Sequence, residues 1–226
     1  MREITVDVMG VAKIYKSKAA QVFAVRDATF SCQASTVTAI MGPSGSGKTT
    51  ILSILGLILK PTRGRVTVMG MDVSELDESQ LPALRRSHIG FIFQAFNLFS
   101  SLTVLENVLL SLQLKKVAAK DALALAMAAL ERVDLVQRSR FYPRDLSGGE
   151  KQRVSIARAI TADTPIILAD EPTANLDSKT GFKIIDLLHE LAEEQHKTVV
   201  VVSHDLRIQE HVNRVLQMED GVIHEN

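Results

Sequence analysis

A glycine-rich stretch, GPSGSGKTT at residues 42–50, has the residue types and spacing of a phosphate-binding loop, or P-loop. It follows the β-branched run 37–41 and precedes the apolar run ILSILGLIL, so it lies between a predicted strand and a predicted helix. Glycines let backbone N–H groups turn toward phosphate oxygens, and the positive end of the helix dipole faces the same oxygens. The predicted nucleotide-binding residues are Gly42, Pro43, Ser44, Gly45, Ser46, Gly47, Lys48, Thr49 and Thr50.

Within this loop, Lys48 is expected to contact the β and γ phosphates and to serve catalysis, and the Thr49 hydroxyl is expected to bind Mg²⁺. An ordinary Gly/Ser loop is the alternative, which the flanking strand and helix disfavour. A P-loop indicates nucleotide-phosphate binding only, because kinases, GTPases and motor ATPases all have one. The remaining motifs must decide among these classes.

A second group of candidate residues is the acidic pair Asp170 and Glu171, which follows the apolar run 166–169. Such a run is typical of a strand buried on both faces, whose carboxyl end lies at the sheet edge where ligands bind. Asp170 is expected to hold the Mg²⁺ shell, and Glu171 to polarise the water that attacks the γ-phosphate. The alternative is that the two carboxylates only cap the next element.

The segment 145–160, DLSGGEKQRVSIARAI, places Ser147, Gly148 and Gly149 at the start of a predicted helix. Free N–H groups at a helix N-terminus form a second anion site. Since one ATP needs only one P-loop, we expect this site to serve the γ-phosphate of ATP held by another subunit. An N-capped helix with no ligand is the alternative.

The elements that position these residues alternate between short β-branched runs and longer helical patterns, which is typical of a parallel buried sheet. The clearest predicted strands are residues 37–41, 166–169 and 198–202. Residues 118–133 read as an amphipathic helix with apolar Leu123, Met127, Leu130 and Val133. A helical subdomain is predicted at roughly residues 95–160, and an antiparallel layer within residues 4–30.

Composition limits the class of protein. The 226 residues predict a single domain, and 26 basic against 26 acidic residues give no polyanion-binding surface, so nucleic acid is not an expected partner. The single cysteine, Cys32, cannot form an internal disulfide. The longest apolar runs, such as 198–202, are far shorter than a membrane span, and the first ten residues lack a signal-peptide core, which predicts a soluble cytoplasmic protein.

Four motifs follow one another along the chain: a P-loop, LSGGE, a strand ending in Asp-Glu, and a histidine after a further strand. This ordered set resembles the nucleotide-binding domain of ABC ATPases over nearly the whole chain. The resemblance implies that Gln94 senses Mg²⁺ and the partner, and that Asp177 faces the opposite subunit. It further implies that His204 is the switch histidine near the γ-phosphate, and that Tyr15 stacks on adenine. Without this context His204 would read as a surface or core histidine, and Tyr15 as an ordinary strand tyrosine.

Three longer segments resemble the branch of lipoprotein-release and macrolide-export ATPases, which also includes the ATPase of a cell-division complex: residues 85–108, 142–160 and 169–178. The chain departs from the family pattern at the turn 34–36, at Lys151 and at Ala174, none of which is a predicted catalytic position.

The resemblance therefore implies an α/β P-loop NTPase fold of the RecA-like kind, with an antiparallel β layer and an inserted helical subdomain, in one domain over residues 1–226. The expected function is that of a Mg²⁺-dependent ATPase subunit, a homodimer formed around ATP, that drives a separate membrane permease from the cytoplasmic face. Phe96, Leu98 and Phe99 either line a groove for a permease helix or belong to the subdomain core. The alternative functions are regulation of a cell-envelope or division complex without transport, and DNA repair, whose ABC proteins carry inserted arms or zinc sites that this sequence lacks.

Overall fold

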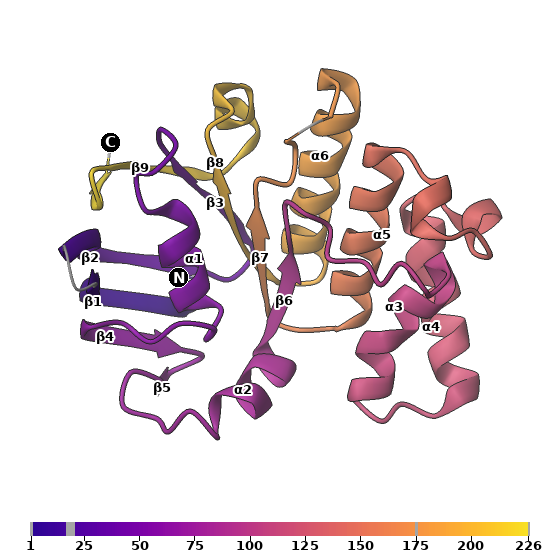
Figure 1. The fold of residues 1–226 in the computed structure, drawn as a ribbon, viewed down its shortest axis with the longest axis horizontal. Coiled ribbons are helices and arrows are strands. Elements are labelled where there is room, and N and C mark those ends of the chain that lie inside the picture. Colours follow the sequence, from indigo (N-terminus) through magenta and orange to yellow (C-terminus); the bar gives the residue numbers. More distant parts are fainter. Residues whose placement is uncertain (1, 17–20, 175, 226) are drawn as a thin grey trace.

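The computed structural model describes residues 2–16, 21–174 and 176–225, and its centre is a six-stranded sheet in the order β10-β9-β3-β8-β7-β6. Strands β9, β3, β8, β7 and β6 are parallel, and β10 pairs antiparallel with β9. Figure 1 shows that the carboxyl ends of β3, β6, β7 and β8 lie along the upper edge of this sheet. The bounds are β3 (Thr36–Met41), β6 (Ile89–Ile92), β7 (Ile166–Asp170), β8 (Thr198–Ser203), β9 (Arg214–Glu219) and β10 (Val222–Glu225).

The three central strands confirm the sequence prediction, and every residue of β3 and β8 is buried. Both faces of the sheet are covered, because one core cluster joins Val199 and Val201 to α6 (Ser178–Glu194) and the helices beyond it. The other cluster joins Val200 and Val202 to α1 (Lys48–Leu55) and the second sheet. A strand buried on both faces needs apolar residues at consecutive positions, which is the pattern of TVVVVS.

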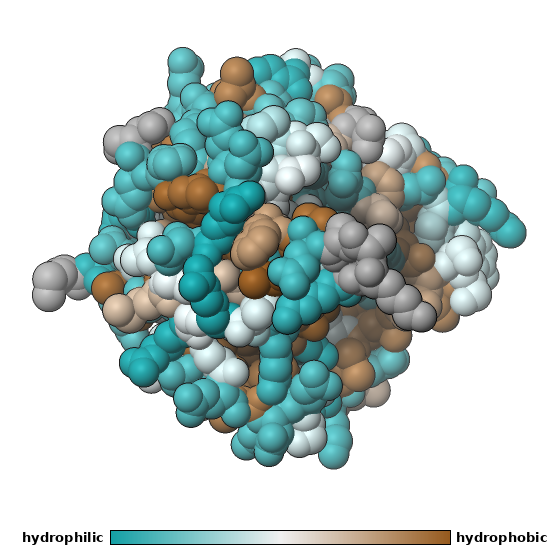
Figure 2. Space-filling view, turned by 60° about the vertical axis from the view of Figure 1, so that its left-hand side comes forward, coloured by the Kyte–Doolittle hydropathy of each residue, from teal (hydrophilic) through white to brown (hydrophobic). Residues whose placement is uncertain are grey.

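A second sheet of four antiparallel strands, in the order β2-β1-β4-β5, covers α1 on the side away from the core sheet. Its strands are β1 (Ile4–Lys16), β2 (Gln21–Gln33), β4 (Arg63–Val68) and β5 (Met71–Asp72). The predicted antiparallel layer is confirmed for β1 and β2, whereas β4 and β5 join it from beyond the P-loop helix. Figure 2 turns this side forward and shows a mainly hydrophilic surface with separate hydrophobic areas.

The helices beyond β6 form a group at the right of Figure 1, where α3 (Val104–Leu114), α4 (Ala119–Arg132) and α5 (Gly148–Thr161) pack together. Capping boxes begin two of them, Thr103 with Glu106 on α3 and Ser147 with Glu150 on α5. The other helical elements are α2 (Leu81–His88), η1 (Val136–Arg138), η2 (Pro143–Asp145), α6 (Ser178–Glu194) and η3 (Leu206–His211).

The buried face of α4 agrees with the predicted apolar positions except at Leu123, since Leu130 and Val133 are buried and Met127 packs against the core. Leu123 is 48% exposed, and the residues that pack inward are Ala122, Ala126, Ala129 and Leu130. Small alanine side chains let α4 approach its neighbours closely, so the large leucine turns outward. Hydrophobicity alone therefore placed this face correctly at three of the four apolar positions and wrongly at Leu123.

No helix in the described ranges has both the length and the hydropathy of a membrane span.

Candidate functional site

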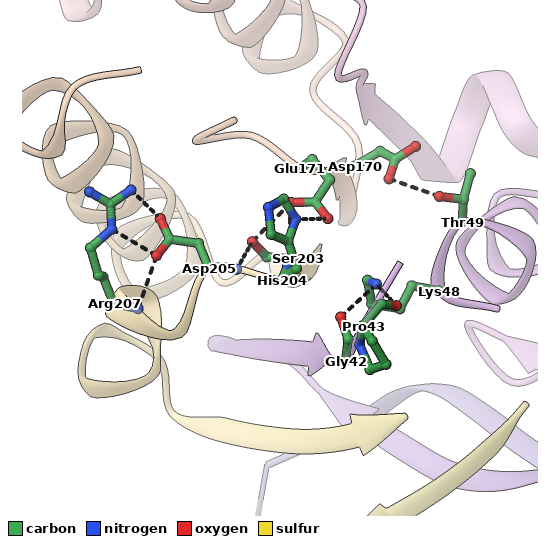
Figure 3. A network of polar contacts seen from close by, with 10 residues as sticks. All are labelled: Gly42, Pro43, Lys48, Thr49, Asp170, Glu171, Ser203, His204, Asp205 and Arg207. Atoms are coloured by element: carbon green, nitrogen blue, oxygen red, sulfur yellow. Dashed lines mark hydrogen bonds and ion pairs between the residues drawn. The ribbon is translucent and has the colours of Figure 1, made fainter. Parts of the chain in front are cut away.

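The P-loop wraps around the ammonium group of Lys48, the first residue of α1. Its Nζ donates to the carbonyl oxygens of Gly42 and Pro43, both at 2.8 Å (Figure 3), and the side chain is only 7% exposed. Burial lowers the pKa of Lys48, although the nearby Glu171 and Asp170 act to raise it. An ammonium whose charged form is disfavoured by its surroundings is well prepared to bind an anion.

The backbone of the loop leaves room for phosphate and offers an unused hydroxyl. Gly47 has φ of +105°, and a Cβ there would lie 2.1 Å from the Ala24 carbonyl oxygen of β2, so only glycine fits. The hydroxyl of Ser46 is buried and has no hydrogen-bond partner within the described residues. Buried hydroxyls are normally paired, so a free one in this loop is a donor for a bound anion.

Residues with oxygen-bearing side chains from three different segments lie beside the loop. The Thr49 hydroxyl donates to Asp170 Oδ1 at 3.3 Å, and Gln94, in the segment after β6, lines one hollow together with Asp170. Burial is the main cause that raises the pKa of Asp170 above its ordinary value, while its bond to Thr49 opposes the shift. Hydroxyl, carboxylate and amide oxygens are the ligands that Mg²⁺ prefers, so the donor set fits this ion.

Glu171, the residue after β7, is held by donors from the end of β8. His204 Nδ1 lies 2.8 Å from Glu171 Oε1, while the Ser203 hydroxyl and the His204 backbone N–H donate to Oε2 at 3.1 and 3.4 Å (Figure 3). The backbone of Glu171 has φ of +46°, an uncommon conformation outside glycine, and its N–H donates to the Val202 carbonyl at 2.9 Å. Two adjacent parallel strands thus place a carboxylate and an imidazole in direct contact.

The sequence analysis did not identify two supporting residues: Ser203, whose hydroxyl donates to Glu171, and Arg158, which contacts the segment after Gln94. The Arg158 guanidinium on α5 donates to the carbonyl oxygens of Asn97 and Phe96 at 2.6 and 2.9 Å, and both of those residues have positive φ. It therefore fixes the turn that follows Gln94. An arginine within the apolar stretch of α5 was the available signal, but its target is distant in sequence.

The second predicted anion site lies apart from the P-loop. Ser147, Gly148 and Gly149 line a hollow with Leu176 and Asp177, at the N-termini of α5 and α6. Asp177 caps α6, accepting from Thr180 N at 3.0 Å. Figure 1 places the start of α5 at the same upper edge as the P-loop but over the helices at the right, away from α1.

Tyr15 lies near the end of β1, opposite Val22 of β2, with its side chain 44% exposed. Lys13 Nζ is 5.6 Å from the ring centroid. An exposed aromatic face is available for stacking.

Comparison with known proteins decides the class of nucleotide-binding protein. A family model described as "ABC transporter" matches residues 25–174, which include the P-loop, Ser147 to Gly149 and the acidic pair. This chain belongs to the ABC transporter ATP-binding family. The resemblance inferred from the motifs is confirmed, and the chain is an ABC ATPase with the P-loop NTPase fold.

Relatives of this ABC ATPase are similar over most of its length. The uncharacterized ABC transporter ATP-binding protein MJ0796 of Methanocaldococcus jannaschii is 43% identical over 217 residues, which are 94% of this chain and 92% of that protein. The macrolide export ATP-binding/permease protein MacB of Escherichia coli (strain K12) is 41% identical over 216 residues. That match covers 96% of this chain but only 33% of MacB, so the chain spans about a third of MacB's length.

Solved structures of ABC cassettes have the same fold. A dimeric, post-hydrolysis structure of MJ0796 bound to ADP and Pi has a TM-score of 0.92 at 42% identity and covers 97% of both chains. CbiO1 of Clostridium perfringens, part of the transporter complex CbiONQ, has a TM-score of 0.87 at 27% identity and covers 98% of this chain and 87% of that one.

Proposed function

We propose that this ABC ATPase forms a homodimer around two ATP molecules and that ATP-driven closure of the dimer drives a separate membrane permease from the cytoplasmic face. The chain acts as one nucleotide-binding domain, in which residues 95–160 are the helical subdomain. Dimeric structures of MJ0796, which is similar over nearly its whole length, support the dimer. The similarity to MacB, a macrolide export protein with its own permease, supports export or a related extracytoplasmic function.

The observation that carries this proposal is the presence of two separate phosphate-facing sites on one chain. One is the P-loop with Lys48, and the other is the N-terminus of α5 with Ser147 to Gly149, in a different hollow. Both lie at one edge of the molecule, as Figure 1 shows. Two chains facing each other along this edge would complete each P-loop with the α5 N-terminus of the other chain.

In this composite site each side chain has a chemical role. Lys48 and the loop N–H groups neutralise and orient the β and γ phosphates, while Tyr15 stacks on adenine. Glu171 accepts the proton of the attacking water, and His204, in contact with Glu171, orients that carboxylate and faces the γ-phosphate. Asp177 faces the opposite subunit beside Ser147 to Gly149.

Mg²⁺ would be held by Thr49, Asp170 and Gln94, whose oxygen atoms fit it as described above. When bound, it neutralises charge on the phosphate oxygens. The protein's own contribution is to keep Thr49 and Asp170 in contact and to bring Gln94 to the same hollow.

A mixture of two inactive variants tests the composite site. Neither Lys48→Ala nor Ser147→Ala should hydrolyse ATP appreciably as a homodimer. The heterodimer has one intact site, made from Lys48 of one chain and Ser147 of the other, so the mixture should regain ATPase activity in a phosphate-release assay. Differential tagging must show that heterodimers form, and a one-site dimer must be shown to turn over ATP. Under these conditions, a mixture no more active than its parents would contradict the shared site.

Thr103→Ala is the matched control for the loss of a helix cap. Thr103 and Ser147 begin α3 and α5 with the same capping box, and in each the hydroxyl accepts from the third backbone N–H at 3.3 Å. Each substitution should cost roughly 0.5–2 kcal/mol of stability. Only Ser147→Ala should also lose activity, because only the N-terminus of α5 belongs to the proposed phosphate site.

A groove between the core and the helical subdomain is the proposed permease-docking site. It is lined by apolar side chains of β6, α3 and the segment after β6, and has a volume of about 710 Å³. Phe99 lines it and is 57% exposed, whereas Leu98 packs against the main core and Phe96 lines the hollow beside Gln94. Of the three predicted groove residues, Phe99 therefore contributes to the groove and Leu98 to the core.

The charged residues that line this groove indicate the charge of the helix that would bind there. Its described lining contains the cations Arg85, Arg86, Lys115 and Arg158 and no Asp or Glu. Arg85, Lys115 and Arg158 donate to backbone carbonyls of this chain. A helix with an apolar face and flanking carboxylates is complementary to such a surface.

Selection of helical peptides tests the groove. In a displayed library with a fixed apolar face and random polar positions, binders selected on the wild-type protein should be enriched in Asp and Glu. Selection on Arg86→Glu should lose this enrichment, while Arg65→Glu, on β4 of the other sheet, should retain it. Binders without charge preference would contradict the proposed partner chemistry.

A further inference from the structure

Glu150, on the first turn of α5, divides its two carboxylate oxygens between two partners. Oε2 accepts from the Ser147 backbone N–H and from the Ser147 hydroxyl, both at 2.8 Å. Oε1 lies 3.1 Å from Nε of Arg138, in η1. Arg138 in turn lies over the ring of Phe141, with its guanidinium carbon 4.7 Å from the centroid.

This arrangement places a negative charge beside the groups that we propose to bind the partner's γ-phosphate. The backbone N–H of Ser147 is the main cause that holds the pKa of Glu150 below its ordinary value, and Arg138 and Arg153 add to the effect. Glu150 is therefore ionised at neutral pH. A carboxylate next to Ser147, Gly148 and Gly149 repels a triphosphate unless a cation compensates it.

We propose that Arg138 is a positioning residue that neutralises Glu150 and holds its carboxylate against Ser147, so that the N–H groups of Gly148 and Gly149 at the N-terminus of α5 accept the γ-phosphate of the opposite subunit. This inference rests on the proposed composite site. A purely structural role for the carboxylate does not require Arg138, because glutamine serves equally at this position of a capping box. The charge of Glu150 creates the need for the arginine.

Dimerisation in a hydrolysis-deficient background tests the inference. In Glu171→Gln protein, the ATP concentration that gives half-maximal dimer by light scattering should rise several-fold when Arg138→Gln is added. Adding Glu150→Gln as well should restore the original value, because the uncompensated charge is then gone. ATP binding to the monomer's own P-loop, measured at low protein concentration, should be the same in all variants.

Arg144→Gln is the matched control. Arg144 belongs to the neighbouring turn η2, lies over the Tyr142 ring and is 3.8 Å from Asp145, but it does not contact the α5 capping box. It should leave the dimer unchanged. Failure of Glu150→Gln to restore dimerisation, or no effect of Arg138→Gln, would overturn this inference alone. Failure of Glu171→Gln itself to dimerise in ATP would instead refute the composite site.

Discussion

Glu171→Gln protein should hydrolyse ATP at least roughly 10²-fold more slowly than wild type, the usual contribution of a general base. Glutamine keeps the shape of the side chain and its contacts to Ser203 and His204, but it cannot accept the proton of the attacking water. ATP should still bind, since Lys48 and the loop are untouched. The uncleaved γ-phosphate then links Lys48 of one chain to Ser147 of the other, and removal of one negative charge reduces repulsion in the closed state.

Two measurements on this variant separate chemistry from assembly. Light scattering should show a dimer in Mg-ATP and a monomer in ADP for Glu171→Gln, and no stable dimer for wild type. Glu193→Gln, an exposed position on α6, should behave as wild type in both assays. Hydrolysis at the wild-type rate would show that Glu171 is not the general base. An inactive variant that stays monomeric in ATP would leave that role intact and contradict the nucleotide-bridged dimer.

Lys48→Ala should weaken the binding of Mg-ATP by roughly tenfold to a hundredfold, since a hydrogen bond to a charged group contributes about 1.5–3 kcal/mol. The stability of the folded protein should change little. Burial lowers the pKa of Lys48, which means that the folded protein disfavours the charged form, so the ammonium adds little to stability without an anion. Titration calorimetry and thermal melting measure the two effects separately.

Lys120→Ala, at an exposed position on α4, removes the same chemical group far from the loop and should leave ATP affinity unchanged. Equal affinity of Lys48→Ala and wild type for Mg-ATP would refute the P-loop assignment. A large drop in melting temperature would show that Lys48 serves the fold through its bonds to Gly42 and Pro43.

The predictable part of the fold is the part in which local pattern and tertiary environment agree. Strands β3, β7 and β8 were found to within one residue because uninterrupted β-branched runs are buried on both faces. The four-residue β6 and the two-residue β5 carry too little pattern to be recognised. The outward turn of Leu123 depends on how closely α4 approaches other helices, which its own sequence does not specify.

The candidate site was predictable to the extent that strand ends define it. Parallel strands finish at one edge, so Asp170, Glu171 and His204 could be placed near Lys48 from the sequence, and the structure brings them together. Arg158, which donates to the Asn97 carbonyl in the turn after Gln94, and Arg138, which pairs with Glu150, were missed because these partners are 61 and 12 positions away along the chain. The roles of these residues in ATP chemistry remain predictions.

The position of β3 between β8 and β9 has a consequence for synthesis of the chain. Both neighbours of the strand that precedes the P-loop, Thr198–Ser203 and Arg214–Glu219, are translated more than 150 residues after it. Until they leave the ribosome, both edges of β3 lack their partners, and such edges invite aggregation. A nascent or truncated chain that lacks β8 and β9 therefore has the P-loop sequence without the sheet that shapes it, so we expect no ATP hydrolysis before both strands have been translated.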